Sequence, residues 1–281
     1  MIVDYLCNAF TPDRAAVWKE ATAGLALKIR DDEFVEPDAM VDRMDELGID
    51  TVLLPAVVVR PGDTPVGTSF EAVAATWPEV EALAQRWPGR FAALTVLDPT
   101  TGSAGVRETR ARLREPWVAG GYLHTHSWDR GLDHADYYPY YALAGDLDVP
   151  VAMQAGASGG MTPSECGRPM GIDRAALYFS DTRFVLSHTG WPWVDEAIAL
   201  ARKFPNVFIG TASYPPRRWP DALVEFVRGA GRNKTLFGTN FPTVGHRQAL
   251  EQVPELGLDA AATEALLGGN ARRVFARLEP A

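Results

Sequence analysis

Eight short apolar or β-branched runs, separated by segments with helical spacing, constrain the fold of this chain more than any other sequence feature. The runs cover residues 2–6, 51–58, 91–97, 121–124, 149–154, 184–188, 207–211 and 235–239. Continuous apolar runs of this length are typical of strands buried on both faces, as in a parallel sheet covered by helices. The pattern therefore indicates an α/β architecture.

Helical patterns lie between these runs. They cover residues 37–48, 71–86, 102–114, 138–146, 193–204, 220–229 and 248–256. In the first of them, Pro37 suits an initial helical turn and Gly48 is placed to end the helix. Alternation of this kind, repeated about eight times, predicts a single (β/α)₈ TIM barrel over residues 1–281. A doubly wound open sheet is the alternative, but no glycine-rich phosphate loop follows the first run.

The charge balance argues against polyanionic partners. The chain has 36 acidic and 27 basic residues, for a net charge of -9, so we expect neither nucleic acid nor an anionic membrane surface to bind it. No apolar run has the length of a membrane span, and no cationic, apolar leader opens the sequence. Cys7 and Cys166 are too few for a disulfide scaffold or a four-cysteine zinc site. These features predict a cytoplasmic protein.

Active sites of this fold use residues at the carboxyl ends of strands, so the predicted barrel indicates where functional residues lie. His188 ends a buried run and is followed by a sharp turn into a helix, where an imidazole is held rigidly and faces a cavity. The other candidates at such ends are Leu6, Cys7, Asn8, Asp98, His124, His126, Gln154, Ser213, Tyr214 and Asn240. His134 and His246 are predicted to be surface residues.

Four segments resemble the amidohydrolase superfamily, in particular the branch that contains aminocarboxymuconate semialdehyde decarboxylase and related decarboxylases, hydratases and lactonases. They read VPVAMQAG at 149–156, FVLSHTGWPWVDEAIALARKFPNVFIGTASY at 184–214, TLFGTNFP at 235–242 and GGNARRVFA at 268–276. The first half of the chain is similar mainly in layout, through Asp4 and the helix before GIDTVLLPA. The resemblance implies a distorted (β/α)₈ barrel that holds a divalent metal, usually zinc.

The family's metal ligands come from an H-x-H pair after strand one, a histidine after strand five and an aspartate after strand eight. Carried over by position, these ligands fall on Leu6, Asn8, Gln154 and Asn240, so all four are replaced. Leucine offers no donor, and neutral amides are weak ligands for zinc. We therefore predict no metal cofactor. The family's acid/base histidine after strand six is retained as His188.

These considerations predict a site built from ten residues. His188 and His124 are the predicted catalytic residues. The predicted substrate-binding residues are Tyr5, Cys7, Asn8, Gln154, Trp191, Tyr214, Arg217 and Asn240. Amides could orient a substrate or stabilise an oxyanion where the metal would lie.

Several of these residues have a second interpretation. His124 and His126 could join His188 in a relocated metal site, although an H-x-H pair alone is a weak signal. Cys7 is either a nucleophile or a small buried apolar residue. Arg217 either holds a carboxylate or is a solvated surface cation.

The predicted function is metal-independent acid/base chemistry on a small carboxylated or aromatic substrate. Decarboxylation, hydration or dehydration is expected first, and lactone or ester hydrolysis is a further option because an imidazole can activate water. Two alternatives stay open: an inactive barrel retained for ligand or partner binding, and a metalloenzyme with relocated histidine ligands. A homodimer is also an option, since the long predicted loop at 155–171 could reach a neighbouring subunit.

Overall fold

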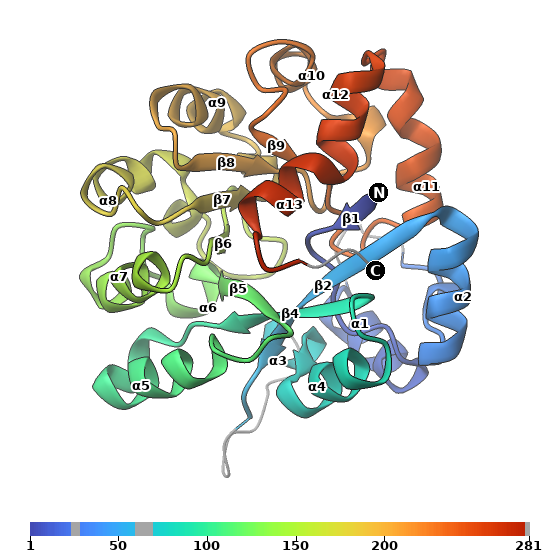
Figure 1. The fold of residues 1–281 in the computed structure, drawn as a ribbon, viewed down its shortest axis with the longest axis horizontal. Helices are drawn as coiled ribbons and strands as arrows, with labels where there is room; N and C mark the ends of the chain where they lie inside the picture. Colours follow the sequence, from blue (N-terminus) through green and yellow to red (C-terminus); the bar gives the residue numbers. More distant parts are fainter. Residues whose placement is uncertain (24–28, 60–69, 279–281) are drawn as a thin grey trace.

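The computed structural model describes residues 1–23, 29–59 and 70–278, and its central element is a curled parallel sheet (Figure 1). The strands are β1 (Ile2–Asp4), β2 (Ile49–Val57), β3 (Ala75–Thr76), β4 (Phe91–Val96), β5 (Val118–Leu123), β6 (Val151–Gln154), β7 (Phe184–Ser187), β8 (Val207–Gly210) and β9 (Thr235–Leu236). Eight of them follow one another in the order β1-β2-β4-β5-β6-β7-β8-β9, while β3 pairs with β2 outside this path. Each pairing is parallel, as predicted from the apolar runs.

The curled sheet closes between its first and last strands through backbone hydrogen bonds. The Tyr5 amide donates to the Phe237 carbonyl at 3.2 Å, and the Asn240 amide donates to the Leu6 carbonyl at 2.8 Å. A third bond, from the Asn8 amide to the Phe241 carbonyl at 2.8 Å, lies beyond the strand ends. These contacts confirm the predicted barrel.

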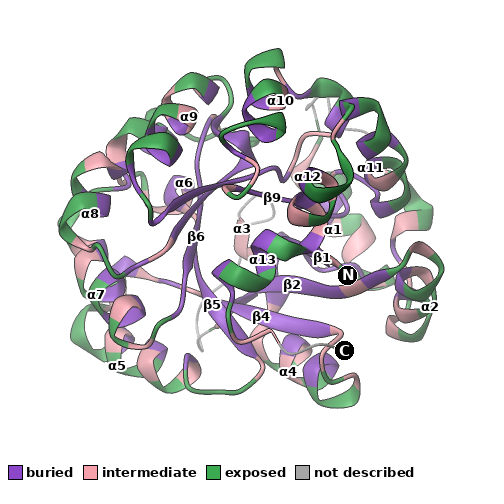
Figure 2. Ribbon diagram, turned by 45° about the horizontal axis from the view of Figure 1, so that its top comes forward, coloured by how far each residue is buried: buried purple, intermediate pink, exposed green. Residues whose placement is uncertain are grey.

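Helices surround the sheet (Figure 1). They are α1 (Ala15–Ala21), α2 (Pro37–Leu47), α3 (Phe70–Val73), α4 (Trp77–Arg86), α5 (Gly102–Arg112), α6 (Thr125–Trp128), α7 (Tyr138–Asp146), α8 (Asp173–Tyr178), α9 (Val194–Lys203), α10 (Asp221–Arg228), α11 (His246–Gln252), α12 (Ala260–Glu264) and α13 (Asn270–Val274). The outer helices are amphipathic, with buried faces against the strands and exposed faces outward (Figure 2). Within the described ranges, no helix is long and apolar enough to cross a membrane.

Two of the predicted helices differ from the observed elements. The prediction of one helix over 71–86 is wrong, because α3 ends at Val73 and a short strand precedes α4. The Glu79 carboxylate accepts the Thr76 amide at 2.6 Å and the Thr76 hydroxyl at 2.8 Å, which starts a new helix at this point. In the predicted helix over 248–256, α11 begins earlier, at His246, and gives way to a 3₁₀ turn over Val253–Leu256.

The first and last strands are shorter than the predicted runs 2–6 and 235–239. β1 ends at Asp4, where the Asp4 carboxylate accepts the Leu6 amide at 3.1 Å and bends the chain. β9 ends at Leu236. The residues beyond both strand ends close the barrel through backbone and side-chain hydrogen bonds, which the apolar pattern does not reveal.

The core has two layers. An outer cluster lies between strands and helices, and an inner cluster fills the barrel with side chains such as Leu53, Leu94, Tyr122 and Val185. Residues of α13 join the inner cluster and plug the amino-terminal end of the barrel, the end that faces the reader in Figure 1.

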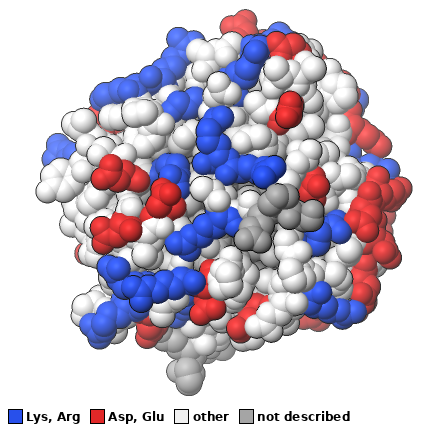
Figure 3. Space-filling model, viewed as in Figure 1, with Lys and Arg blue, Asp and Glu red and all other residues white. Residues whose placement is uncertain are grey.

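Lys and Arg side chains lie across the middle of this plugged face (Figure 3). Two arginines bind backbone carbonyls at this end: Arg277 donates to the Leu147 carbonyl, and Arg183 donates to the carbonyl of Val274 in α13. The amino-terminal end is therefore stabilised by packing and hydrogen bonds, and chemistry is expected at the opposite end, the barrel mouth.

Candidate active site

Tyr5 forms the floor of the barrel mouth. Its side chain is fully buried, and a Cβ atom added at Gly210 or Gly238 would lie within 2.4 Å of its ring atoms or hydroxyl oxygen. Its hydroxyl oxygen is 2.5 Å from Ser187 Oγ, and its ring lies 6.4 Å from that of Phe275 below. Burial raises the pKa of Tyr5, so the phenol is neutral. Tyr5 separates the mouth from the α13 plug, and its predicted substrate contact stays a prediction.

His188 lies just beyond β7, in a turn with unusual backbone angles. Side chains alternate between the two faces of a strand. Because the Ser187 hydroxyl contacts Tyr5 inside the barrel, a regular strand would point the next side chain, that of His188, outward. The strand ends there, and His188 and Thr189 adopt φ values of 59° and 57°. Such left-handed conformations cost roughly 1–3 kcal/mol each in a non-glycine residue and cluster at functional sites. Two further cases, Ser213 and Asn240, follow β8 and β9.

The His188 side chain has an unused hydrogen-bonding atom. It is 8% exposed, and its Nδ1 is buried with no partner in the described chain. Burial and the neighbouring His126 imidazole lower the pKa of His188 to about 3. The imidazole is therefore neutral at neutral pH and can accept a hydrogen bond or a proton.

His124 and His126 follow β5 and face the same space, with ring centroids 5.8 Å apart. His124 Nδ1 is 2.7 Å from Ser127 Oγ, and the ring of Phe70 stacks on the His124 ring at 4.3 Å. Burial, together with His126 and His188, holds the pKa of His124 well below its usual range. We call His124, His126 and His188 the histidine corner.

His126 anchors the loop after β6. Its Nε2 donates to the Gly156 carbonyl at 3.1 Å, and burial lowers its pKa. A Cβ at Gly167 would lie 2.3 Å from the Gly156 oxygen, so only glycine allows this close packing. The two ends of this loop, at Gly156 and Gly167, therefore pack against each other and against His126.

The opposite side of the mouth is a polar seam between the ends of β1 and β9. Asn8 Nδ2 donates to Asn240 Oδ1 at 2.9 Å and to the Phe241 carbonyl at 3.1 Å. Asn240 Nδ2 in turn donates to Ser213 Oγ at 2.8 Å and to Thr243 Oγ1 at 3.3 Å. The structure therefore brings together Asn8 and Asn240, two predicted site residues that are 232 positions apart.

Asp4 and His246 continue this seam beneath the amides. His246 Nε2 donates to Asp4 Oδ2 at 2.9 Å, and both side chains are fully buried. Asp4 also accepts hydrogen bonds from the Thr239 amide and hydroxyl. The prediction of His246 as a surface residue is wrong, because α11 packs its first residue onto the closing strands. His134 is exposed, as predicted. We use the name seam for Asp4, Asn8, Thr239, Asn240 and His246.

Gln154 completes the set of positions where the family holds a metal. It pairs in register with Ser187, which points into the barrel, and its side chain has no hydrogen-bond partner among the described residues. Leu6 lies in the apolar inner cluster, and the Asn240 oxygen is already bound to Asn8.

These residues do not fit a divalent metal. None of the four positions carries a charged or imidazole donor. Elsewhere in the described ranges, no group of three or more His, Cys, Asp or Glu side chains is placed to hold an ion. The relocated site at the histidine corner therefore finds no support in the geometry.

Cys7 is buried outside the barrel interior, and Arg217 is exposed and already paired. Cys7 belongs to the outer cluster and donates to the Asn8 carbonyl at 3.4 Å, and burial raises its pKa well above the usual range. This is the environment of an inert buried thiol rather than a nucleophile. Arg217 is 63% exposed and forms a bidentate pair with Glu255. Substrate contact by either residue stays a prediction.

Trp191 and Tyr214 form an aromatic rim, with ring centroids 5.9 Å apart. Trp191 is 46% exposed, and its carbonyl accepts the Ala157 amide at 2.6 Å. The rim therefore joins the His188 turn to the loop after β6. The sequence reasoning missed Ser187 and Phe70: strand alternation could have pointed to Ser187, whereas no pattern marks Phe70 as the residue that covers His124.

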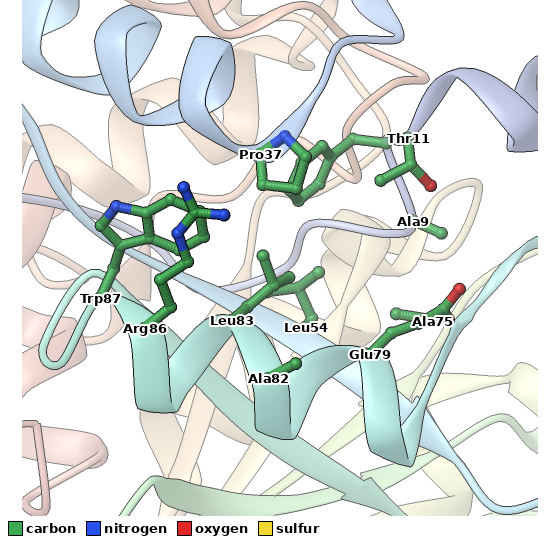
Figure 4. Close-up of a pocket in the computed structure, with 11 residues that line it drawn as sticks. Ala9, Thr11, Pro37, Leu54, Ala75, Glu79, Ala82, Leu83, Arg86 and Trp87 are labelled. Atoms are coloured by element: carbon green, nitrogen blue, oxygen red, sulfur yellow. The ribbon is translucent and has the colours of Figure 1, made fainter.

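A separate pocket of about 250 Å³ lies outside the sheet, between α2 and α4 (Figure 4). Leu54, Leu83 and Pro37 give it an apolar lining, and none of its lining residues belongs to the predicted site. The histidine corner and the seam are therefore the better candidate for catalysis, because their polar groups converge at the barrel mouth.

Comparisons with solved structures show the same fold. An uncharacterised TIM-barrel protein from Bordetella bronchiseptica is 23% identical, with a TM-score of 0.78 over 99% of both chains. A 5-carboxyvanillate decarboxylase from Novosphingobium aromaticivorans, solved with bound manganese, is 14% identical, with a TM-score of 0.69 over 98% of this chain and 97% of that one. A 4-oxalomesaconate hydratase from Rhodopseudomonas palustris is 19% identical, with a TM-score of 0.63 over 99% and 96%.

No curated protein matches the sequence. The amidohydrolase family model, however, matches residues 15–277, nearly the whole barrel. This match confirms the resemblance noted in the strand-end motifs. The chain belongs to the amidohydrolase family.

Proposed function

We propose that this protein is a lyase-type enzyme that acts without a metal on a small carboxylated or aromatic substrate, with His188 as its general acid and base. The observation that carries the proposal is the His188 imidazole, which is held in a strained turn at the barrel mouth with a buried, unpartnered Nδ1. The structural neighbours include a decarboxylase and a hydratase, which supports lyase chemistry over other reactions of this fold.

In a decarboxylation, the bond between the carboxyl carbon and the substrate breaks, and carbon dioxide leaves. The electron pair stays on the substrate carbon, which takes a proton from His188. The imidazole, neutral in the free protein, first acquires this proton from solvent, and solvent restores it after each turnover. Hydration or dehydration would use the same imidazole to remove a proton from water or return one to a leaving hydroxyl. Such proton transfer contributes roughly 10²- to 10⁴-fold to a rate.

The amides complement this chemistry. Asn8 Oδ1 and the Gln154 side chain have hydrogen-bonding capacity that no described neighbour uses. They occupy positions at which the resemblance implies metal ligands, and their free polar atoms are suited to orient a carboxyl or hydroxyl group. Electrostatic stabilisation from fixed polar groups needs no reorganisation during the reaction.

The test is turnover of a panel of hydroxylated benzoic and phthalic acids, followed by loss of substrate absorbance and release of carbon dioxide. We expect His188→Gln to lower kcat by about 10²- to 10⁴-fold with little change in KM. His134→Gln, at an exposed histidine, is the matched control and should leave kcat unchanged.

Two results would contradict the proposal. Stoichiometric metal in the purified protein, removed by a chelator together with activity, would replace it with the metalloenzyme alternative. Retention of ligand binding without turnover of any panel member would favour the inactive, ligand-binding barrel.

A further inference from the structure

The barrel mouth is rich in neutral hydrogen-bonding groups, and several arginines around the barrel are already bound to carboxylates. Arg43 donates to Glu33 at 2.9 Å, Arg168 to Glu196 at 2.8 Å, and Arg217 to Glu255. A carboxylate that leaves water for a buried site requires an opposite charge or a proton. An imidazole at this mouth can supply that charge by taking up a proton.

His188 is the best placed of the three imidazoles. His124 Nδ1 is occupied by Ser127, and His126 Nε2 by the Gly156 carbonyl, whereas His188 Nδ1 has no partner in the described residues. Burial of His188 strongly favours its neutral form while the mouth holds no anion. A carboxylate beside it would reverse this preference, because an opposite charge stabilises the imidazolium.

Other titratable groups near His188 do not supply the missing charge. His124 and His126 face it from the end of β5, and their pKa values are lowered as well. Tyr5 lies below it and Tyr214 follows β8, and burial raises the pKa of both phenols, so both are neutral.

The acidic side chains nearby are Asp129, Asp195 and Glu196. The charge of Asp129 favours the protonated form of His126. Asp195 and Glu196 lie in the first turn of α9, where Glu196 is bound to Arg168. These groups carry negative charge and cannot neutralise a carboxylate.

We propose that the barrel mouth binds the carboxyl group of its substrate together with one proton taken from solution, which is held at His188. On binding, the substrate carboxylate, the neutral His188 imidazole and one proton from solvent form an imidazolium–carboxylate pair. This inference rests on the proposed function, since it assumes a carboxylated substrate. The same proton is then in place for transfer to carbon.

The experiment is calorimetric titration of the whole protein with salicylate and with salicylamide, the uncharged counterpart. Repetition in buffers of different ionisation enthalpy gives the number of protons taken up. We expect close to one proton per salicylate and none per salicylamide. We also expect the Kd for salicylate to rise about tenfold per pH unit above neutrality, while the Kd for salicylamide stays flat.

Variants locate the proton. His188→Gln should abolish the uptake, and His188→Asn provides a second substitution if the first protein fails to fold, as judged by thermal unfolding. His134→Gln should retain the full uptake, because this histidine is exposed and lies beside Asp136 rather than in the histidine corner. Uptake that persists in both His188 variants would overturn the assignment to this residue.

The outcomes separate this inference from the proposed function. Salicylate binding without proton uptake, or no salicylate binding, overturns the inference even if another acid is turned over. Proton uptake without turnover of any acid overturns the enzymatic function and leaves proton-linked carboxylate binding in place.

Discussion

The two sides of the barrel mouth use their polar side chains in opposite ways. In the seam, Asp4 accepts hydrogen bonds from Leu6, Thr239 and His246, and the Asn8 and Asn240 amides bind each other. Apart from His246 Nδ1, the buried side-chain atoms of the seam have partners. In the histidine corner, His188 Nδ1 and the adjacent Thr189 Oγ1 are buried and have no hydrogen-bond partner in the described part of the chain.

This difference separates a structural role from a chemical one. Buried polar atoms in native proteins are almost always paired, so an unpaired atom at the barrel mouth, such as His188 Nδ1, is available to a substrate or to water. In the seam, Asn8 and Asn240, two of the four positions at which the resemblance implies metal ligands, bind each other and so connect the segments that follow the first and last strands. The corner keeps an imidazole that is available for substrate.

The largest effect is expected when the buried carboxylate of the seam is removed. Asp4→Ala leaves His246 and two groups of Thr239 without their acceptor, and breaking a fully buried pair costs about 3–5 kcal/mol. Urea unfolding of the variant should show this loss. Asp13→Ala, at an acid that is 71% exposed, should change the unfolding free energy by less than about 0.5 kcal/mol. An Asp4 variant as stable as the control would mean that the seam does not hold the barrel closed.

The same contrast explains which features could be predicted from sequence. The alternation of apolar runs predicts the parallel barrel, and the barrel places His188, Asn8 and Asn240 at one end, because the carboxyl ends of parallel strands meet there. The motifs around His188 predict the family, which the comparisons confirm.

Side-chain direction beyond the strand ends could not be predicted. The burial of His246 depends on its contact with Asp4, 242 positions away, and that contact exists only once the barrel closes. Cys7 lies in the outer layer and Arg217 turns to Glu255, since bends after the strands set their directions. The inward position of His188 depends on a left-handed backbone that apolar patterning does not reveal.

A smaller effect is expected in the pH dependence of stability at the histidine corner. An unfolded histidine has a pKa of about 6.5, whereas burial lowers that of His188 in the folded protein to about 3. Below about pH 6.5 the unfolded chain therefore binds a proton that the folded chain does not, so stability is lost as pH falls towards the folded pKa. The loss attributable to His188 approaches about 1.4 kcal/mol per pH unit.

Urea unfolding at several pH values between about 7 and 4 measures this slope. The slope for His188→Gln should be lower than that of the wild type by up to about 1.4 kcal/mol per pH unit. His134→Gln, at an exposed histidine, should keep the wild-type slope. Equal slopes in all three proteins would show that His188 is not buried in its neutral form, and the contrast between corner and seam would lose its electrostatic basis.

The smallest effect concerns the aromatic rim. Trp191 is 46% exposed and contacts Tyr214, so Trp191→Leu removes aromatic surface at the mouth with little loss of packing. We expect the unfolding free energy to change by less than about 0.5 kcal/mol, while KM for an aromatic acid rises several-fold and kcat is nearly unchanged. Tyr178→Leu, at an aromatic residue on α8 that is 80% exposed, is the matched control and should alter neither quantity. A fall in kcat in the Trp191 variant would instead show that the rim positions the His188 turn, because the two are joined within four residues of chain.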